Sequence, residues 1–132
     1  MPDKKLIAAL KTVAMSRGTV IVDENLQEIS EYLKELNIRV RLPPQGMPDN
    51  KIVEDYLPNR VFVTNNSKDF LRAAVIYDIG IIATENIKSK DPKKLANMVS
   101  DAIIDFSLWS QRGGFLLTLM SNGKHKFKPL VD

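Results

Sequence analysis

Acidic and amide side chains follow two apolar runs, at the points where each predicted strand ends. The run Thr19-Val20-Ile21-Val22 stops at Asp23-Glu24-Asn25, and Val61-Phe62-Val63-Thr64 is followed by Asn65-Asn66-Ser67-Lys68-Asp69. Open α/β folds bind their ligands in the crevice at the carboxyl ends of the strands. Carboxylate and amide oxygens are the ligands that hard divalent cations prefer. The two runs therefore predict one shared polar site that suits a divalent cation.

Three aspartates are the candidate ligands of such a cation: Asp23, Asp49 and Asp69. Three acids that converge on one crevice would hold Mg²⁺ or Mn²⁺, which keep bound waters for chemistry. Each position also has a second interpretation, because Asp23 or Asn25 suits a helix cap after the first strand, Asp49 stands where an N-cap would, and Asp69 suits either role. Strand alternation leads us to expect Asp23, rather than Glu24, in the crevice.

Other polar positions contribute less to the predicted site. Glu85-Asn86 follows the fourth predicted strand and could supply another oxygen ligand, whereas residues 87–91 read as a solvated loop. We expect His125, the only histidine, to be solvated in a lysine-rich hairpin, which gives no basis for a Ser-His-Asp triad. Gly113-Gly114 precedes a strand instead of opening a helix, so a P-loop or a dinucleotide fingerprint is excluded.

Length and composition limit the class of protein. The chain has 132 residues, 44% of them hydrophobic, which suits one domain over 1–132 with a real core. A formal charge of +3 is compatible with a polyanionic partner without requiring one. The absence of cysteine excludes disulfides and zinc-thiolate sites and fits a reducing compartment. The apolar stretch near the N-terminus is short and is broken by Lys11, so we expect neither a signal peptide nor a membrane span, and a cytoplasmic location.

The elements that must position these residues alternate between helix and strand. Helical spacing of apolar residues predicts helices, and short β-branched runs predict strands. The predicted helices cover 6–14, 26–36, a short segment after Asp49, and 68–74, and the predicted strands cover 19–23, 38–42, 61–64 and 80–84. This alternation predicts an α/β fold with a mainly parallel sheet that is covered on both faces.

The last third of the chain, 92–130, predicts a helix followed by a β-hairpin. Apolar residues recur every three to four positions from Pro92 to Trp109, and Gly113-Gly114 would end that helix. Residues 115–119 and 125–129 would then pair across a turn that contains Asn-Gly. Trp109 and Phe115 suit core packing, and they also suit a surface for a homodimer or another protein partner.

The order of the motifs resembles the PIN-like domain family, in particular its Mut7-C type. The resemblance rests on Val22-Asp23-Glu24-Asn25-Leu26, then Pro48-Asp49-Asn50, then Val63-Thr64-Asn65-Asn66-Ser67-Lys68-Asp69-Phe70. It covers about residues 19–87, and the C-terminal helix and hairpin lie outside it. The resemblance implies a three-layer α/β/α domain that binds Mg²⁺ or Mn²⁺ and cleaves RNA, often as the toxin of a toxin-antitoxin pair.

The acidic positions of the family's motifs have aspartate counterparts here, with one exception. The resemblance implies that Asp23, Asp49 and Asp69 are the catalytic, metal-binding acids. One position departs from the pattern, because this chain has Asn65-Asn66, with one extra residue, where the family has its first Asp after Thr. An amide there removes one negative charge, which should lower metal affinity and the activation of water.

An intact site would perform metal-assisted hydrolysis of RNA phosphodiesters. The acids would hold one or two cations, which polarise a phosphate oxygen and lower the pKa of an attacking water. Thr64, Asn66 and Lys68 would position the phosphate, with Arg72 as a further cation. Lysines 124, 126 and 128 would either extend the RNA track or protect an edge strand from aggregation.

Two other functions stay open at this point. The first is a catalytically degenerate PIN-like module that binds RNA or a protein partner, which the Asn65-Asn66 replacement favours. The second is a receiver-like signalling domain, since acids follow the first strand and Thr84 ends the fourth. The receiver pattern lacks an Asp at the end of the middle strand and a Lys after the last one.

Overall fold

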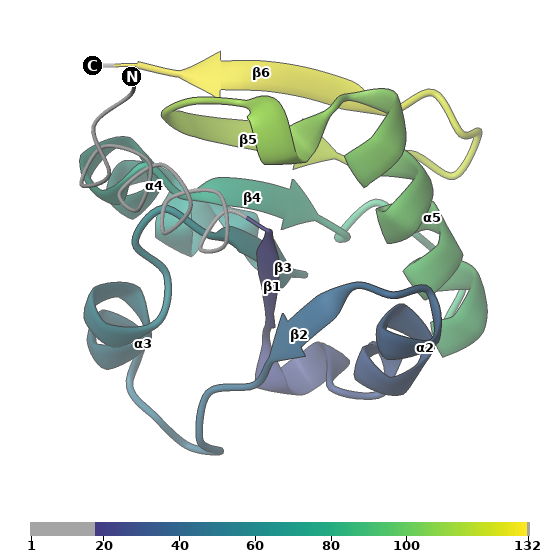
Figure 1. Cartoon of the computed structure of the whole chain (residues 1–132), viewed down its shortest axis with the longest axis horizontal. Helices are drawn as coiled ribbons and strands as arrows, with labels where there is room; N and C mark the ends of the chain where they lie inside the picture. Colours follow the sequence, from purple (N-terminus) through teal and green to yellow (C-terminus); the bar gives the residue numbers. More distant parts are fainter. Residues whose placement is uncertain (1–17, 132) are drawn as a thin grey trace, which may run out of the picture.

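The computed structural model describes residues 18–131, and the helix predicted over 6–14 lies outside them. The described residues form an α/β fold around one six-stranded sheet (Figure 1). The strands are β1 (Thr19–Val22), β2 (Arg39–Arg41), β3 (Val61–Thr64), β4 (Gly80–Ala83), β5 (Gly114–Thr118) and β6 (Lys126–Leu130). The α-helices are α2 (Ile29–Glu35), α3 (Asp49–Asp55), α4 (Leu71–Tyr77) and α5 (Pro92–Asp105). Three short 3-10 helices complete the fold: η1 (Glu24–Leu26), η2 (Ser67–Phe70) and η3 (Leu108–Ser110).

The sheet is mainly parallel, as the sequence predicts. The strand order is β2-β1-β3-β4-β5-β6, and every neighbouring pair is parallel except β5 and β6, which form the antiparallel C-terminal hairpin. The carboxyl ends of β1, β3 and β4 therefore lie side by side at one edge of the sheet. This edge receives the polar segments that follow those strands in the sequence.

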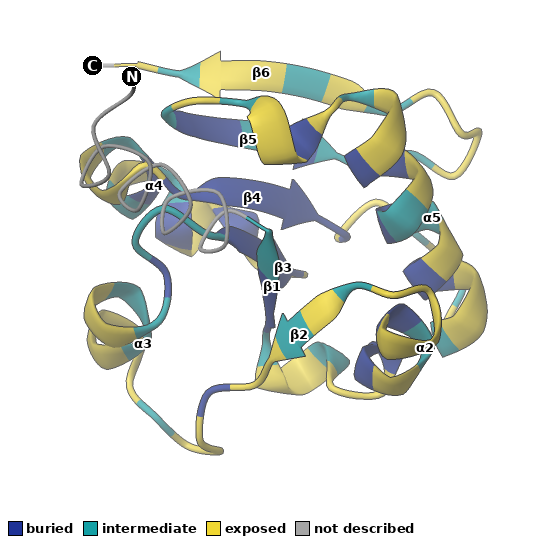
Figure 2. Cartoon of the chain, viewed as in Figure 1, coloured by how far each residue is buried: buried dark blue, intermediate teal, exposed yellow. Residues whose placement is uncertain are grey.

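The central strands are buried on both sides, because consecutive side chains enter two different apolar clusters. Every residue of β3 and β4 is buried (Figure 2). In β1, Val20 and Val22 belong to one cluster, whereas Ile21 belongs to the other. Such alternation places the two clusters on opposite faces of the sheet.

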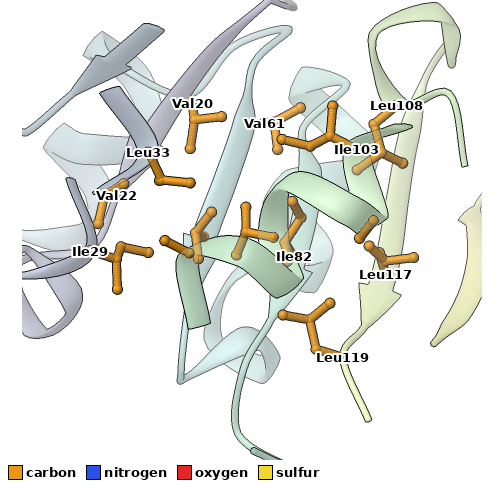
Figure 3. Close-up of a cluster of buried hydrophobic side chains, with 14 of the residues drawn as sticks. Val20, Val22, Ile29, Leu33, Val61, Ile82, Ile103, Leu108, Leu117 and Leu119 are labelled. Atoms are coloured by element: carbon orange, nitrogen blue, oxygen red, sulfur yellow. The ribbon is translucent and has the colours of Figure 1, made fainter. Parts of the chain in front are cut away.

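The larger cluster is covered by α2 and α5. Ile29 and Leu33 of α2 and Val99 and Ile103 of α5 pack with the strand side chains that point to this face (Figure 3). The buried residues of α5 run from Leu95 to Ile103 at a spacing of three to four, as expected for the apolar stripe that the sequence predicts. Asp91 caps this helix, since its Oδ1 accepts a hydrogen bond from Lys93 N at 3.0 Å.

The smaller cluster lies on the opposite face and includes residues of α3 and α4. Phe62 and Phe70 form its aromatic centre, with ring centroids 4.8 Å apart and planes at 70°. Ala74 of α4 and the partly buried Ile52 and Val53 of α3 complete the packing. Edge-to-face contact of this kind is favourable because the positive ring edge meets the negative ring face.

One of the crossover connections differs in hand from the others. The connections β2-α3-β3 and β3-α4-β4 move toward β6 in the strand order, and their helices lie on the face of the smaller cluster. The connection β1-α2-β2 moves in the opposite direction, and its helix lies on the face of the larger cluster. These three connections therefore share one hand. The connection β4-α5-β5 keeps the direction of α4 but uses the face of α2, so its hand is opposite, although about 98% of parallel crossovers share the right-handed sense.

Several element boundaries differ from the sequence predictions. The helix predicted over 26–36 is divided into η1 and α2, and the helix predicted over 68–74 begins as η2 and continues as α4 to Tyr77. The helix that opens at Pro92 ends at Asp105, well before Gly113, because Ser107 adopts a left-handed conformation with φ of 49°. Isolated positive φ values are uncommon for serine, and its hydropathy gives no sign of such a break.

The C-terminal hairpin is packed onto the body of the fold. Phe115 is buried in the larger cluster, which confirms the core interpretation, whereas Trp109 in η3 is 36% exposed. Phe127 of β6 contacts the rings of Phe106 and Phe115, at centroid distances of 6.0 and 5.3 Å. Within residues 18–131, no helix has the length and apolar character needed to cross a membrane.

Candidate functional site

Asp23 lies where β1 leaves the sheet, beside the end of β3. Its backbone N–H donates to the carbonyl of Val63 at 3.1 Å, so the backbone is still held by the ladder. Its half-exposed carboxylate accepts one hydrogen bond from Thr64 Oγ1 at 2.8 Å and a long one from Asn25 N at 3.5 Å. Asp23 is therefore both the N-cap of η1 and a member of the strand-end site. The two positions predicted for Asp23, as a helix cap and at the strand ends, are therefore compatible.

Thr64 connects the ends of three strands. Its buried hydroxyl donates to Asp23 and accepts from the backbone N–H of Asn66 at 3.1 Å. Its carbonyl accepts two hydrogen bonds from Thr84 at the end of β4, from the backbone N–H at 3.0 Å and from Oγ1 at 3.3 Å. A hydroxyl that donates and accepts in a buried position has its orientation fixed by both partners.

The segment after β3 supplies the other polar groups of the site. Asn66 Nδ2 donates to Asp69 Oδ2 at 2.5 Å, and both residues are exposed. The buried Ser67 hydroxyl donates to Oε2 of Glu85, also at 2.5 Å, and so joins this segment to the one after β4. Lys68 lies in the same segment, in η2, and is exposed. The structure thus brings together most of the site residues that the sequence predicts.

Asp49 has a different position. It is exposed and forms the first residue of α3, and Pro48 is the N-cap, with no hydrogen bond from a capping side chain. The prediction of Asp49 as the N-cap is therefore wrong. Along the described chain, no hydrogen bond joins Asp49 to Asp23, Thr64 or Asp69.

Glu24 does not share the position of Asp23. Its Oε2 accepts a hydrogen bond from Gly46 N at 2.9 Å, which ties the proline-rich loop to η1. Gly46 has φ of 79°, a conformation that glycine adopts without strain. Glu24 therefore holds a loop, and Asp23 is the acid that meets Thr64.

The donor set suits an open cation site better than a preformed cage. Over residues 18–131, no three His, Cys, Asp or Glu side chains are grouped closely enough to hold a metal ion. Mg²⁺ is usually bound by one or two carboxylates together with substrate phosphates, and it keeps several waters. Asp23 is the carboxylate at the strand ends that could take such a role. The full set of Asp23, Asp49 and Asp69 as ligands stays a prediction.

A pocket opens beside these strand ends, between η1–α2 and the start of α5. Its volume is about 500 Å³, and it shares Asn25, Asn65, Thr84 and Glu85 with the site or its immediate neighbours. The sequence predictions do not include this pocket, because residues 87–91 are predicted to form a solvated loop. The signal in the sequence is Ile87, an apolar residue among polar neighbours, and in the structure this side chain is half-buried.

His125 also differs from its predicted setting. It is half-buried, and its Nδ1 accepts a hydrogen bond from the backbone N–H of Met120 at 3.1 Å. The expectation of a solvated side chain is therefore wrong, and the imidazole helps to close the turn of the hairpin. No local sequence pattern predicts this hydrogen bond between Met120 and His125.

Comparisons with family profiles, curated proteins and solved structures found no match to this chain. Its function must therefore be inferred from the geometry of the strand-end site and from the motifs that compose it.

Proposed function

We propose that this chain is a PIN-like, divalent-cation-dependent ribonuclease that acts at the carboxyl edge of β1, β3 and β4. The observation that carries the proposal is the bond of 2.8 Å from the buried Thr64 hydroxyl to the partly exposed Asp23 carboxylate. A carboxylate held in one orientation at a strand end, with its face open to solvent, is suited to bind a cation and a phosphate.

The residues around Asp23 have separate roles in this proposal. Asp69, with Asp49 as the further predicted ligand, adds carboxylate charge, and Thr64 acts through Asp23 as a positioning residue. Asn66 and Lys68 are exposed in the adjoining segment and would bind a phosphate oxygen. When bound, Mg²⁺ or Mn²⁺ supplies charge stabilisation at the phosphate and lowers the pKa of a water.

The arrangement of the helices supports the three-layer α/β/α form of the PIN-like interpretation. Helices α2 and α5 contribute to one buried cluster and α3 and α4 to the other, on opposite faces of the sheet. The resemblance extends the proposal to a toxin that works with an antitoxin partner. The exposed Trp109 and Ile104 would give such a partner, or a second copy, an apolar contact.

A second candidate is a PIN-like module that binds RNA without cleaving it. The hydrogen bond from Asn66 to Asp69 favours this function, because it occupies an amide and a carboxylate that would otherwise face a cation. Binding would then depend on the polar groups and the nearby cations, and divalent ions would be dispensable.

The deciding experiment combines Mn²⁺ calorimetry with cleavage of a mixed single-stranded RNA pool. Asp23→Asn keeps the size of the side chain and the bond to Thr64 but removes the charge. Asp55→Asn is the matched control, because Asp55 is exposed and is the last residue of α3, at the opposite end of that helix from Asp49. We expect Asp23→Asn to lower both Mn²⁺ affinity and cleavage by at least about 10-fold, and the control to match the wild type.

Each outcome separates the two candidates. Cleavage that needs Mn²⁺ and depends on Asp23 would establish the nuclease. RNA binding without cleavage, together with no detectable heat of Mn²⁺ binding, would favour the non-catalytic module. A chain that neither binds nor cleaves RNA would refute both.

A further inference from the structure

The pocket beside the strand ends has walls of two kinds. Leu26 and Ile29 come from η1 and α2, and Ile87 and Leu95 come from the other side, before and within α5. Ile29 and Leu95 are almost fully buried, with 2% and 8% exposure, so the floor of the pocket is apolar. A volume of about 500 Å³ falls within the range of roughly 300–1,000 Å³ typical of small-ligand pockets.

Polar groups line the side of the pocket that adjoins the strand-end site. Asn65 directly follows the residue that orients Asp23, and Thr84 and Glu85 directly follow β4. Two exposed cations, Lys88 and Lys90, stand on the connection to α5. An apolar floor, a few hydrogen-bonding groups and outer cations together suit a flat heterocycle that carries a phosphate.

We propose that this pocket receives one nucleobase of the RNA strand, and that it selects a base with an exocyclic amino group over uracil. The inference rests on the proposed function, since it assigns a recognition pocket to the same RNA. The ribose-phosphate linkage of the bound nucleotide would then lie between the Asp23–Thr64 site and the two lysines.

Two acidic residues, Glu28 and Glu85, line the pocket, and we assign the selectivity to Glu85, whose carboxylate is held by a hydrogen bond. Its Oε2 accepts this hydrogen bond from the Ser67 hydroxyl at 2.5 Å, which fixes the orientation of the carboxylate. A carboxylate only accepts hydrogen bonds, so it pairs with the 4-amino group of cytosine and opposes the 4-oxo group of uracil. Asn65 can pair with either base, because its amide both donates and accepts.

The lysines would act on affinity without contributing to selectivity. Lys88 and Lys90 are exposed, and ammonium groups bind phosphates as point charges whose effect does not depend on the base. Replacing either lysine should therefore weaken all RNA sequences by a similar factor.

The test measures RNA binding in EDTA, so that cleavage and metal binding play no part. Fluorescence anisotropy would compare seven-nucleotide oligo(C) and oligo(U) on the full-length chain. We expect oligo(C) to bind at least about 10-fold tighter, as one charge-assisted hydrogen bond allows. Glu85→Gln should reduce this ratio to about 3-fold or less, because an amide can donate to uracil O4. Glu54→Gln, an exposed change on α3, is the control that keeps the ratio.

A second measurement locates the bound base. Cytidine monophosphate should shift the NMR methyl signals of Ile87 and Leu95 in the pocket, and leave those of Ile52 and Val53 on the other face unchanged. Circular dichroism would verify that Glu85→Gln is folded.

The inference and the proposed function fail in different ways. Equal binding of oligo(C) and oligo(U), or no binding of either in EDTA, overturns the base pocket. Cleavage of RNA in Mn²⁺ without preference for the base would leave the nuclease intact while overturning the pocket. If the wild type does not cleave RNA in Mn²⁺ but prefers oligo(C) in EDTA, the nuclease is overturned and the pocket is supported.

Discussion

At the residue scale, the buried hydroxyl of Thr64 determines how Asp23 is presented. It donates to the carboxylate and accepts from the backbone of Asn66, so it orients an acid and shapes the following turn at once. A valine at this position would have nearly the same shape but could do neither. The loss would leave the backbone N–H of Asn66 without this partner and the carboxylate of Asp23 free to rotate.

We therefore expect Thr64→Val to affect both stability and activity. The free energy of unfolding should fall by about 1–3 kcal/mol, since a hydrogen-bonded group loses its partner. Cleavage or Mn²⁺ affinity should fall by about 10–100-fold, as is typical when a residue that orients a ligand is removed. Urea denaturation and calorimetry would measure the two effects.

The matched control is Thr64→Ser, which keeps the hydroxyl and loses only a methyl group. It should retain most of the activity of the wild type. A valine variant as active as the serine variant would show that Asp23 needs no such support.

At the scale of elements, β5 reaches its place because two glycines leave room for neighbouring groups. A Cβ on Gly114 would collide with the carbonyl oxygen of Ala74 in α4. A Cβ on Gly80 would collide with the ring of Phe115, which lies across it in the β4-β5 register. The obstacle at Gly114 is a backbone atom and the obstacle at Gly80 is a side chain. Only the second can be relieved by shortening the neighbouring side chain.

This difference gives a prediction about rescue. Gly114→Ala and Gly80→Ala should each lower the free energy of unfolding by about 1–3 kcal/mol, the usual range for overpacking. Adding Phe115→Leu should recover part of the loss for Gly80→Ala and none for Gly114→Ala. The urea midpoints of the single and double variants would decide the matter, and equal recovery in both would contradict the packing argument.

At the scale of the whole molecule, the two apolar clusters share one sheet and cannot melt independently. Val20 and Val22 face one cluster and Ile21 faces the other, so the same strand backbone supports both. Loss of either cluster removes the support of the other. A small domain of this construction should unfold in one step.

Truncation of a buried leucine in each cluster tests this expectation. Leu33→Ala and Leu57→Ala should each destabilise the fold by about 2–5 kcal/mol, and in each variant Trp109 fluorescence and far-UV circular dichroism should report the same midpoint. Separate midpoints for the two signals in either variant would show that the faces unfold as separate units.

The sequence predicts the parallel strands and the acids at their ends for a physical reason. Runs such as Val61–Thr64 are apolar throughout because both faces are covered, and polar residues begin where that cover stops. Asp23 and Thr64 could thus be assigned to one edge from spacing alone. Contacts between distant segments could not, since neither the bond of His125 to Met120 nor the pocket between η1 and α5 leaves a periodic pattern.

The unusual hand of the β4-α5-β5 connection decides whether that pocket exists at all. If α5 crossed on the face of α3 and α4, residues 87–95 would leave the side of η1, and Leu26 and Ile29 would have no opposite wall. Val61, Val63 and Ile82 would also lose the cover that α5 provides. The chain thus adopts a disfavoured topology. Because α5 lies on this face of the sheet, it both covers the larger cluster and forms one wall of the pocket. A variant in which the β4-β5 connection crossed on the other face of the sheet would keep the strands and lose the cavity.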